Sequence, residues 1–296
     1  WWCADENHLH EHLATAFSHI ESGLRSSRWS SWHLLFSENS SLLHNRSISL
    51  PHTPAHPPVH KKPFSASASK KLLLNRQDTQ FHWVNHDYQQ FDDFLARLKS
   101  RKRKKLRHER NRVAEQGVIL QRKEGVTLTH EDWQEFYACY RNTYLVRGQT
   151  PYLTAAFFNA IGAARADQIM MVQARRDDQL VGAALFFHDN ETLYGRHWGA
   201  REQVDCLHFE ACFYQGIEYC IERGLRSFDP GTQGEHKLLR GFEPVQTTSW
   251  HWIAHPAFRD AIARHLDWEK NQSERYFEAA GQWLPYKVES TDRDDD

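Results

Sequence analysis

The chain has 296 residues, enough for one large domain or two of ordinary size. Hydrophobic residues make up 40%, charged residues make up 25% and the net charge is −1, which together exclude wholesale disorder. No apolar run approaches the ~20 residues that a membrane-spanning helix needs, so we expect no integral membrane segment. The chain begins with Trp1 and no leader pattern follows, and we expect a fragment or a processed product.

Cysteine and histidine form no recognisable disulfide or metal pattern. The five cysteines are an odd number and include no CxxC pair, which argues against a disulfide framework and a zinc ribbon. The 20 histidines include no HExxH spacing, so no metal site is predicted. We therefore expect reduced, mostly buried thiols and a cytoplasmic protein.

Residues 1–78 are expected to form a partial N-terminal subdomain with a short strand over 32–36. Within it, residues 44–71 hold five prolines and many Ser and His, which predicts a loop or insertion. A domain over 79–278 follows, beginning with a strand at 79–84, and residues 279–296 form an acidic tail.

A long basic helix is predicted over residues 88–116, with an apolar stripe on one face and Gly117 as its stop. Residues 97–112 contain ten Lys or Arg and one Glu, while the rest of the chain is acidic. Like charges four residues apart repel each other, so this density favours a bound polyanion over a solvated helix surface, which is the alternative. The predicted polyanion-binding residues are Arg101, Lys102, Arg103, Lys104, Lys105 and Arg107.

The next elements follow from hydrophobic periodicity and from turn residues between apolar runs. A capping box at Thr129–Asp132 begins a helix with an aromatic stripe, and Thr154 caps another helix. Polar turns then separate three strands of an antiparallel meander, and further helices and strands follow. The expected strands are 169–174, 180–187, 192–198, 225–228 and 247–254, and the expected helices are 208–223 and one beginning at Pro256.

This order of elements is that of the GNAT acyltransferase fold, and several strings strengthen the match. They are residues 100–110, 194–199, 208–212, 214–219, 228–237 and 240–242. Together they resemble the bacterial FemAB-like, or FemABX-related, peptidoglycan biosynthesis and recognition family of the GNAT superfamily. The resemblance covers residues 79–275. It implies an α+β fold with a mixed, mostly antiparallel sheet flanked by helices, and a shortened N-terminal GNAT-like half.

The loop Gly231–Lys237 is the densest polar constellation in the chain. Two glycines let its backbone approach a ligand, and Glu235, His236 and Lys237 offer a base, an imidazole and an anion clamp. We predict these three residues to be catalytic; a tight turn whose polar groups satisfy one another is the alternative. The predicted substrate-binding residues are Arg196, His197, His208, Glu210 and Gln233. An ordinary ion pair is the alternative for Arg196 and His197, and helix capping is the alternative for His208 and Glu210.

Acetyl-CoA users of the GNAT fold hold pyrophosphate on backbone amides of a (Q/R)xxGx(G/A) loop. The corresponding stretch here, residues 196–201, keeps Gly199 but has Arg201 at the second small position. FemABX relatives use aminoacyl-tRNA, and a basic helix suits a tRNA backbone. The resemblance thus implies an N-acyltransferase that moves an aminoacyl or acyl group to an amine of a cell-wall precursor. The alternatives are a non-catalytic RNA- or polyanion-binding module and an acyl-CoA-dependent N-acetyltransferase acting on a small amine.

Overall fold

The computed structural model describes residues 19, 23, 30–37, 74–232 and 234–287. The predicted loop 44–71 and residues 288–296 of the predicted acidic tail lie outside these residues. The chain forms two compact units, Trp1–Gln80 with Pro244–Gln282, and Phe81–Glu243 with Trp283–Asp296. The predicted division into 1–78, 79–278 and 279–296 stays a prediction.

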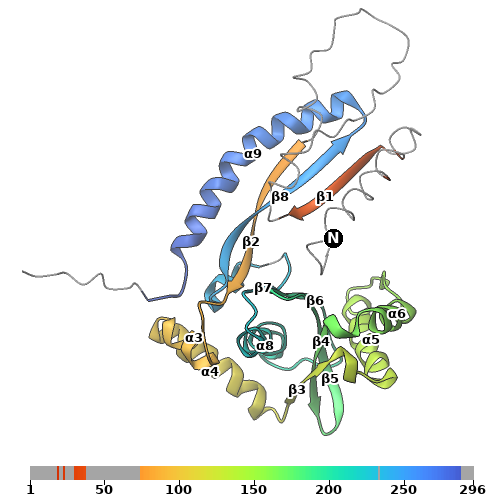
Figure 1. The fold of residues 1–296 in the computed structure, drawn as a ribbon, viewed down its shortest axis with the longest axis vertical. Coiled ribbons are helices and arrows are strands. Elements are labelled where there is room, and N and C mark those ends of the chain that lie inside the picture. The colour runs from red at the N-terminus through yellow and green to blue at the C-terminus, as the bar shows by residue number, and fades with distance from the viewer. Residues whose placement is uncertain (1–18, 20–22, 24–29, 38–73, 233, 288–296) are drawn as a thin grey trace, which may run out of the picture. The chain divides into compact units, whose positions relative to one another are not determined.

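The first unit contains a three-stranded piece of sheet and a long helix. Strand β1 (Ser31–Ser37) pairs antiparallel with β8 (Glu243–Ile253), and β8 lies beside the first part of β2 (Leu74–Val84). Pro256 opens α9 (Pro256–Gln282), as expected from its fixed φ. The Arg76 guanidinium on β2 donates to Glu269 on α9 at 2.8 Å, which fixes the helix beside the strand (Figure 1).

The second unit is built on a sheet in the order β2-β7-β6-β5-β4-β3 (Figure 1). The meander is confirmed, because β4, β5 and β6 pair antiparallel in sequence order. Strand β7 runs parallel to β6, and the other neighbours are antiparallel. Their bounds are β3 Ile119–Glu124, β4 Ile169–Arg176, β5 Gln179–His188, β6 Thr192–Ala200 and β7 Ser227–Asp229. The predicted α+β class with a mixed, mostly antiparallel sheet flanked by helices is thereby confirmed.

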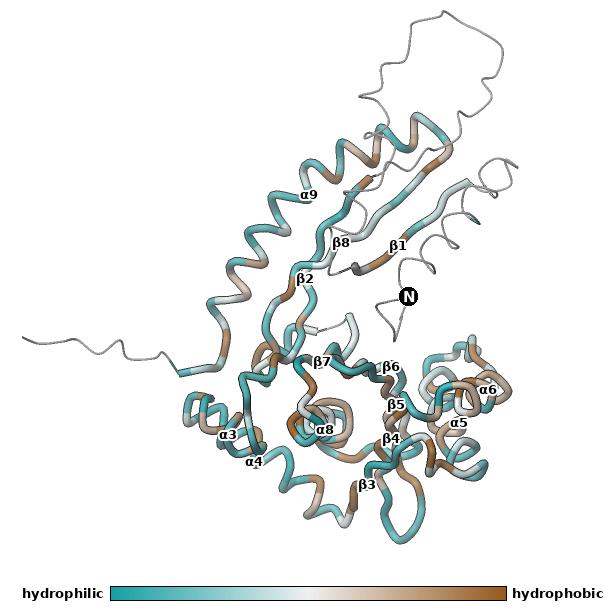
Figure 2. Tube along the Cα trace, viewed as in Figure 1, coloured by the Kyte–Doolittle hydropathy of each residue, from teal (hydrophilic) through white to brown (hydrophobic). Residues whose placement is uncertain are grey.

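Two helices cover part of this sheet. Thr129 caps α5 (His130–Leu145) through a capping box with Asp132, as predicted, and Thr154 accepts from the Phe157 N–H to cap α6 (Ala155–Ala164). The aromatic stripe of α5 packs on β4 and β5, where apolar residues concentrate (Figure 2). Gly199 on β6 is required here because a Cβ would lie 2.1 Å from the backbone oxygen of Cys139 on α5.

One expectation for this unit is wrong: residues 88–116 do not form a single helix. They form α3 (Phe91–Arg97) and α4 (Ser100–Glu115), separated by an extended Leu98 and Lys99. Leu98 forms a β-bridge with Tyr286, and the Lys99 N–H donates to the Pro285 carbonyl at 2.8 Å. These backbone partners replace the helical hydrogen bonds and interrupt the helix.

The helix predicted over 208–223 is present but irregular. It comprises α7 (Leu207–Phe209), a π-helical turn (Glu210–Tyr214) and α8 (Gln215–Arg223). Three short 3₁₀ helices complete the unit: η2 (Gly125–Thr127), η3 (Ala166–Gln168) and η5 (Glu235–Arg240). Among the helices of the described residues, none is long and apolar enough to cross a bilayer.

Candidate functional site

The carboxylate of Asp229, at the end of β7, is the centre of one polar cluster. It accepts from both terminal nitrogens of Arg196 at 3.3 Å and from the Gly231 N–H at 2.8 Å. The imidazole of His82 lies 3.7 Å away. Asp229 was not among the residues predicted to form the site, although it ends a short strand directly before Pro230 and Gly231, where the loop begins. The structure thus brings the predicted residue Arg196 to the start of the Gly231–Lys237 loop.

Lys237 lies on the other side of this loop and is buried, with 2% of its surface exposed. Its ammonium donates to the Gly231 carbonyl. Burial lowers the pKa of Lys237 to about 8, although the charge of Asp229 acts in the opposite direction. Lys237 is therefore mainly cationic at neutral pH, but it loses its proton at a pH only slightly above neutral.

His236 and His208 lie close together beside this lysine, with ring centroids 6.5 Å apart. Gly234 permits this arrangement: its φ is +101° and a Cβ there would meet the His236 ring at 2.0 Å. Burial, followed by the charge of neighbouring cations, lowers the pKa of His208 to about 4 and also lowers that of His236. Both imidazoles are therefore neutral at pH 7, and their lowered pKa values make them weak bases.

Arg240 connects this loop to α4. Its guanidinium donates to both carboxylate oxygens of Glu109 at 2.8 and 3.0 Å, to the Tyr214 hydroxyl at 3.0 Å and to the His236 carbonyl at 3.0 Å. The same guanidinium lies 3.4 Å from the Phe209 ring centroid. Arg240 and Glu109 are both buried, so this pair fixes the backbone of the loop relative to the basic helix.

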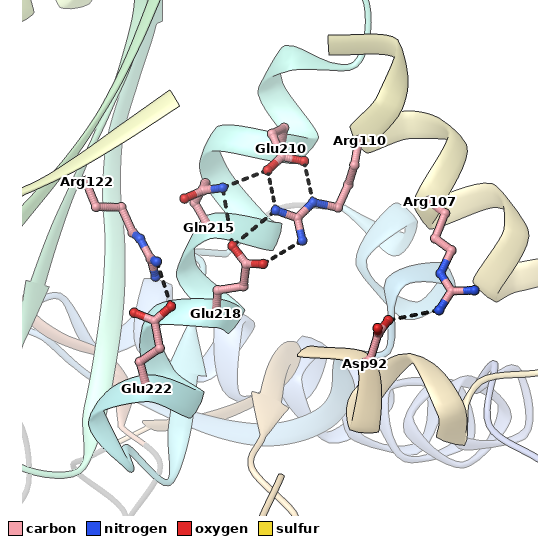
Figure 3. A network of polar contacts seen from close by, with 8 residues as sticks. All are labelled: Asp92, Arg107, Arg110, Arg122, Glu210, Gln215, Glu218 and Glu222. Atoms are coloured by element: carbon pink, nitrogen blue, oxygen red, sulfur yellow. Dashed lines mark hydrogen bonds and ion pairs between the residues drawn. The ribbon is translucent and has the colours of Figure 1, made fainter. Parts of the chain in front are cut away.

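Glu210, predicted to bind substrate, is held inside a network of protein side chains (Figure 3). Its oxygens accept from Arg110 at 3.0 Å each and from Gln215 at 2.8 Å. Arg110 also donates to Glu218 at 2.7 Å. This network joins α4 to the π-helical turn and α8, which gives Glu210 a structural function; its substrate contact stays a prediction.

The remaining predicted residues are placed separately. His197 does not join the Asp229 cluster but packs against Tyr140 and Phe158, at ring distances of 5.4 and 5.5 Å, and burial lowers its pKa to about 4. Glu235 is exposed at the start of η5, and Gln233 lies outside the described residues.

Half of the cations of α4 have no ion-pair partner among the described residues, namely Arg101, Lys102, Arg103 and Lys104. Arg107 lies 2.9 Å from Asp92 and Lys105 lies 3.8 Å from Glu109, and Arg110 and Arg112 also pair with acidic side chains. Burial lowers the pKa of Lys102, and four nearby cations, including Arg240, add to the effect. Arg240 itself is buried and paired with Glu109, so it places the loop beside α4 without adding free positive charge.

The stretch compared with a pyrophosphate loop is not a loop. Residues 196–200 belong to β6, where residues 197–200 pair with β5 and Arg196 lies at a register shift, and the Arg201 N–H donates to the Val181 carbonyl at 2.8 Å. A pyrophosphate cradle needs a ring of free N–H groups, which this paired strand does not offer.

A cavity of about 360 Å³ lies in the first unit, and no predicted site residue lines it. His33, His251 and His265 line it with Arg76 and Glu269. No group of three or more metal-ligating side chains is found in the part of the chain that the structure describes.

The meander, the parallel β7 and the polar loop that follows it define an α+β protein of GNAT-like architecture. The family model of FemAB-like peptidoglycan biosynthesis and recognition proteins matches residues 3–288. The chain therefore belongs to the FemAB-like family. No curated protein gives a significant match.

Several solved structures are distantly similar to this chain. The C-terminal domain of a putative lysylphosphatidylglycerol synthetase from Agrobacterium fabrum is 11% identical, with a TM-score of 0.46 over 67% of this chain and 66% of that one. FemX is 12% identical, with a TM-score of 0.45 over 62% and 64%. A tandem GNAT protein from the clavulanic acid biosynthesis pathway is 13% identical, with a TM-score of 0.44 over 82% and 70%. The chain spans less than two thirds of the length of the first two structures.

Proposed function

We propose that this protein is an N-acyltransferase of the FemABX type, which transfers an aminoacyl group from a tRNA to an amine of a peptidoglycan precursor. The observation that carries the proposal is the row of cations on α4, Arg101 to Lys104, without ion-pair partners in the described residues. Arg240 bonds both Glu109 on α4 and the backbone of the predicted catalytic loop, which places the loop beside this helix. Phosphates held on α4 would thus lie near that loop.

The chemistry assigns different tasks to the loop residues. The amine nitrogen attacks the ester carbonyl carbon, and the bond from that carbon to the ribose oxygen then breaks. Glu235, exposed at the loop, accepts the proton that the amine loses, and this proton passes to the departing ribose oxygen. Lys237, cationic below its pKa of about 8, stabilises the negative charge that develops on the carbonyl oxygen.

Membership of the family supports a peptidoglycan precursor as the acceptor, because the family is described as one of peptidoglycan biosynthesis and recognition. The paired backbone of β6 favours tRNA over acyl-CoA as donor, since it leaves no amide cradle at residues 196–201. A tRNA donor and reduced thiols both fit a cytoplasmic protein.

Filter binding with tRNA across a salt series tests the donor. If Arg101 to Lys104 neutralise four phosphates, the slope of log affinity against log salt is about −2.8 to −3.6. Replacing these four residues by alanine should flatten that slope. The matched control is Arg223→Ala with Arg226→Ala, two exposed cations that already pair with Glu124 and Glu191.

Turnover with charged tRNA and a lipid-linked muropeptide tests the transfer itself. Formation of the new amide, lost in the α4 variant and kept in the control, supports the proposal. Salt-dependent tRNA binding without turnover would replace it by the non-catalytic binding module. Absence of tRNA binding would remove the aminoacyl-tRNA donor.

A further inference from the structure

Residues 141–165, from the end of α5 through α6, form a segment of unusual composition. They contain three arginines and no Asp or Glu, in a chain that has 37 basic and 38 acidic side chains. The ten residues of α6 include no charged side chain at all. Uncharged helices are normally buried on all sides, because their outer face gains nothing from water.

The inner face of α6 is packed as expected. Phe158 and Gly162 are buried, and Phe158 lies 5.1 Å from Phe136 between ring centroids. Gly162 faces Trp133 so closely that a Cβ would lie 2.7 Å from its ring. The helix is therefore firmly attached to α5, and its outer face is held in a fixed position.

Several large apolar side chains of the segment are open to solvent, with Gln149, Thr150, Thr154 and Asn159 as its exposed uncharged polar residues. Val146 is 73% exposed, Tyr152 68%, Leu145 49% and Phe157 39%. Along α6, Phe157 continues into a stripe of exposed alanines at helical spacing. The stripe consists of Ala156, Ala160, Ala163 and Ala164.

The charges of the segment all have one sign. Arg141, Arg147 and Arg165 are exposed, and none of them forms an ion pair with another described residue. Long arginine side chains can extend past an apolar surface and place their charge at phosphate level, while tyrosine prefers the boundary between hydrocarbon and water. An apolar surface with a purely cationic border is complementary to an anionic lipid bilayer.

We propose that the surface formed by residues 141–165 docks on the face of a membrane that contains anionic lipid. The outer face of α6, with Val146 and Tyr152, enters the interface between headgroups and acyl chains, and the three arginines contact lipid phosphates. Each arginine strengthens binding to an anionic surface about fivefold. This proposal is independent of the transfer reaction and needs neither donor nor acceptor.

Vesicle co-sedimentation of the full chain tests it, using phosphatidylcholine alone and with 30% phosphatidylglycerol. The decisive variant is Val146→Glu with Phe157→Glu. The matched control is Ile119→Glu with Val126→Glu, two residues 76% and 70% exposed outside the surface, which adds the same charge. Measurements at 0.5 M NaCl suppress the purely electrostatic contribution of α4.

We expect the wild type and the control to bind the anionic vesicles, and the decisive variant to bind at least about tenfold more weakly at high salt. Equal weakening by both double variants, or no binding by the wild type, would overturn the proposal. The proposal would also be overturned if the wild type is a dimer, the decisive variant is a monomer and both bind vesicles equally well. The surface would then be an interface between two copies of this chain. Circular dichroism of each variant checks that these exposed substitutions leave the fold intact.

Discussion

Replacing Glu109 by glutamine keeps the volume of the side chain but removes the charge that neutralises Arg240. Both side chains are buried, at 5% and 3% exposed, so the guanidinium would remain in the interior without a counter-charge. Removing one partner of such a pair costs about 3–5 kcal/mol. For a unit of this size, that cost lowers the melting temperature by roughly 6–20 °C.

Urea unfolding of Glu109→Gln, followed by circular dichroism, measures this loss. The matched control is Lys105→Ala, which removes the exposed cation 3.8 Å from the same carboxylate and should cost less than about 1 kcal/mol. The double variant Glu109→Leu with Arg240→Met should be more stable than Glu109→Gln, because no charge is left buried. A loss below about 1 kcal/mol in Glu109→Gln, or a double variant less stable than the single one, would refute the role given to this pair.

Three further predictions concern the loop and the thiols. Glu235→Gln should lower turnover by about 10²–10⁴-fold at an unchanged melting temperature, since an amide replaces an exposed general base; a lowered melting temperature with normal turnover per folded molecule would contradict it. The folded-state pKa of Lys237, about 8 against an ordinary 10.5, means that the unfolded chain binds more protons between these pH values. Wild-type stability in urea should therefore rise by roughly 3 kcal/mol from pH 8 to 10.5, and Lys237→Met should lose that rise. Burial raises the pKa of Cys139 to about 11 and that of Cys220 well above its usual range, so both should resist thiol reagents in the native protein, as mass spectrometry of labelled peptides will show.

Local signals in the sequence were enough to predict much of the second unit. The meander follows from alternating apolar runs with polar turns, and the start of α5 follows from the Thr129–Asp132 capping box. These features depend on residues close together in the chain. Strand β3 was missed because its six residues, ILQRKE, carry only a weak alternation.

Features that depend on distant residues were not predicted. The break between α3 and α4 arises from backbone partners at Pro285 and Tyr286, which no local pattern reveals. The pairing of Glu109 with Arg240 had a signal that was overlooked. Glu109 lies three residues after the buried Leu106 and four before the buried Val113, on the inner face of an otherwise basic helix.

The break between α3 and α4, at Leu98 and Lys99, has a consequence for synthesis on the ribosome. Its backbone partners belong to residues 283–287, and Tyr286 also donates its hydroxyl to the Gly241 carbonyl. A nascent chain that already contains α4 must wait until residues 283–287 have been made before this backbone pairing can form. Until then, residues 98 and 99 have no strand to pair with, and the helical segments on either side are free to join into one longer helix. The cationic surface thus reaches its final geometry only after residues 283–287 have been made, although its own residues precede them in the chain.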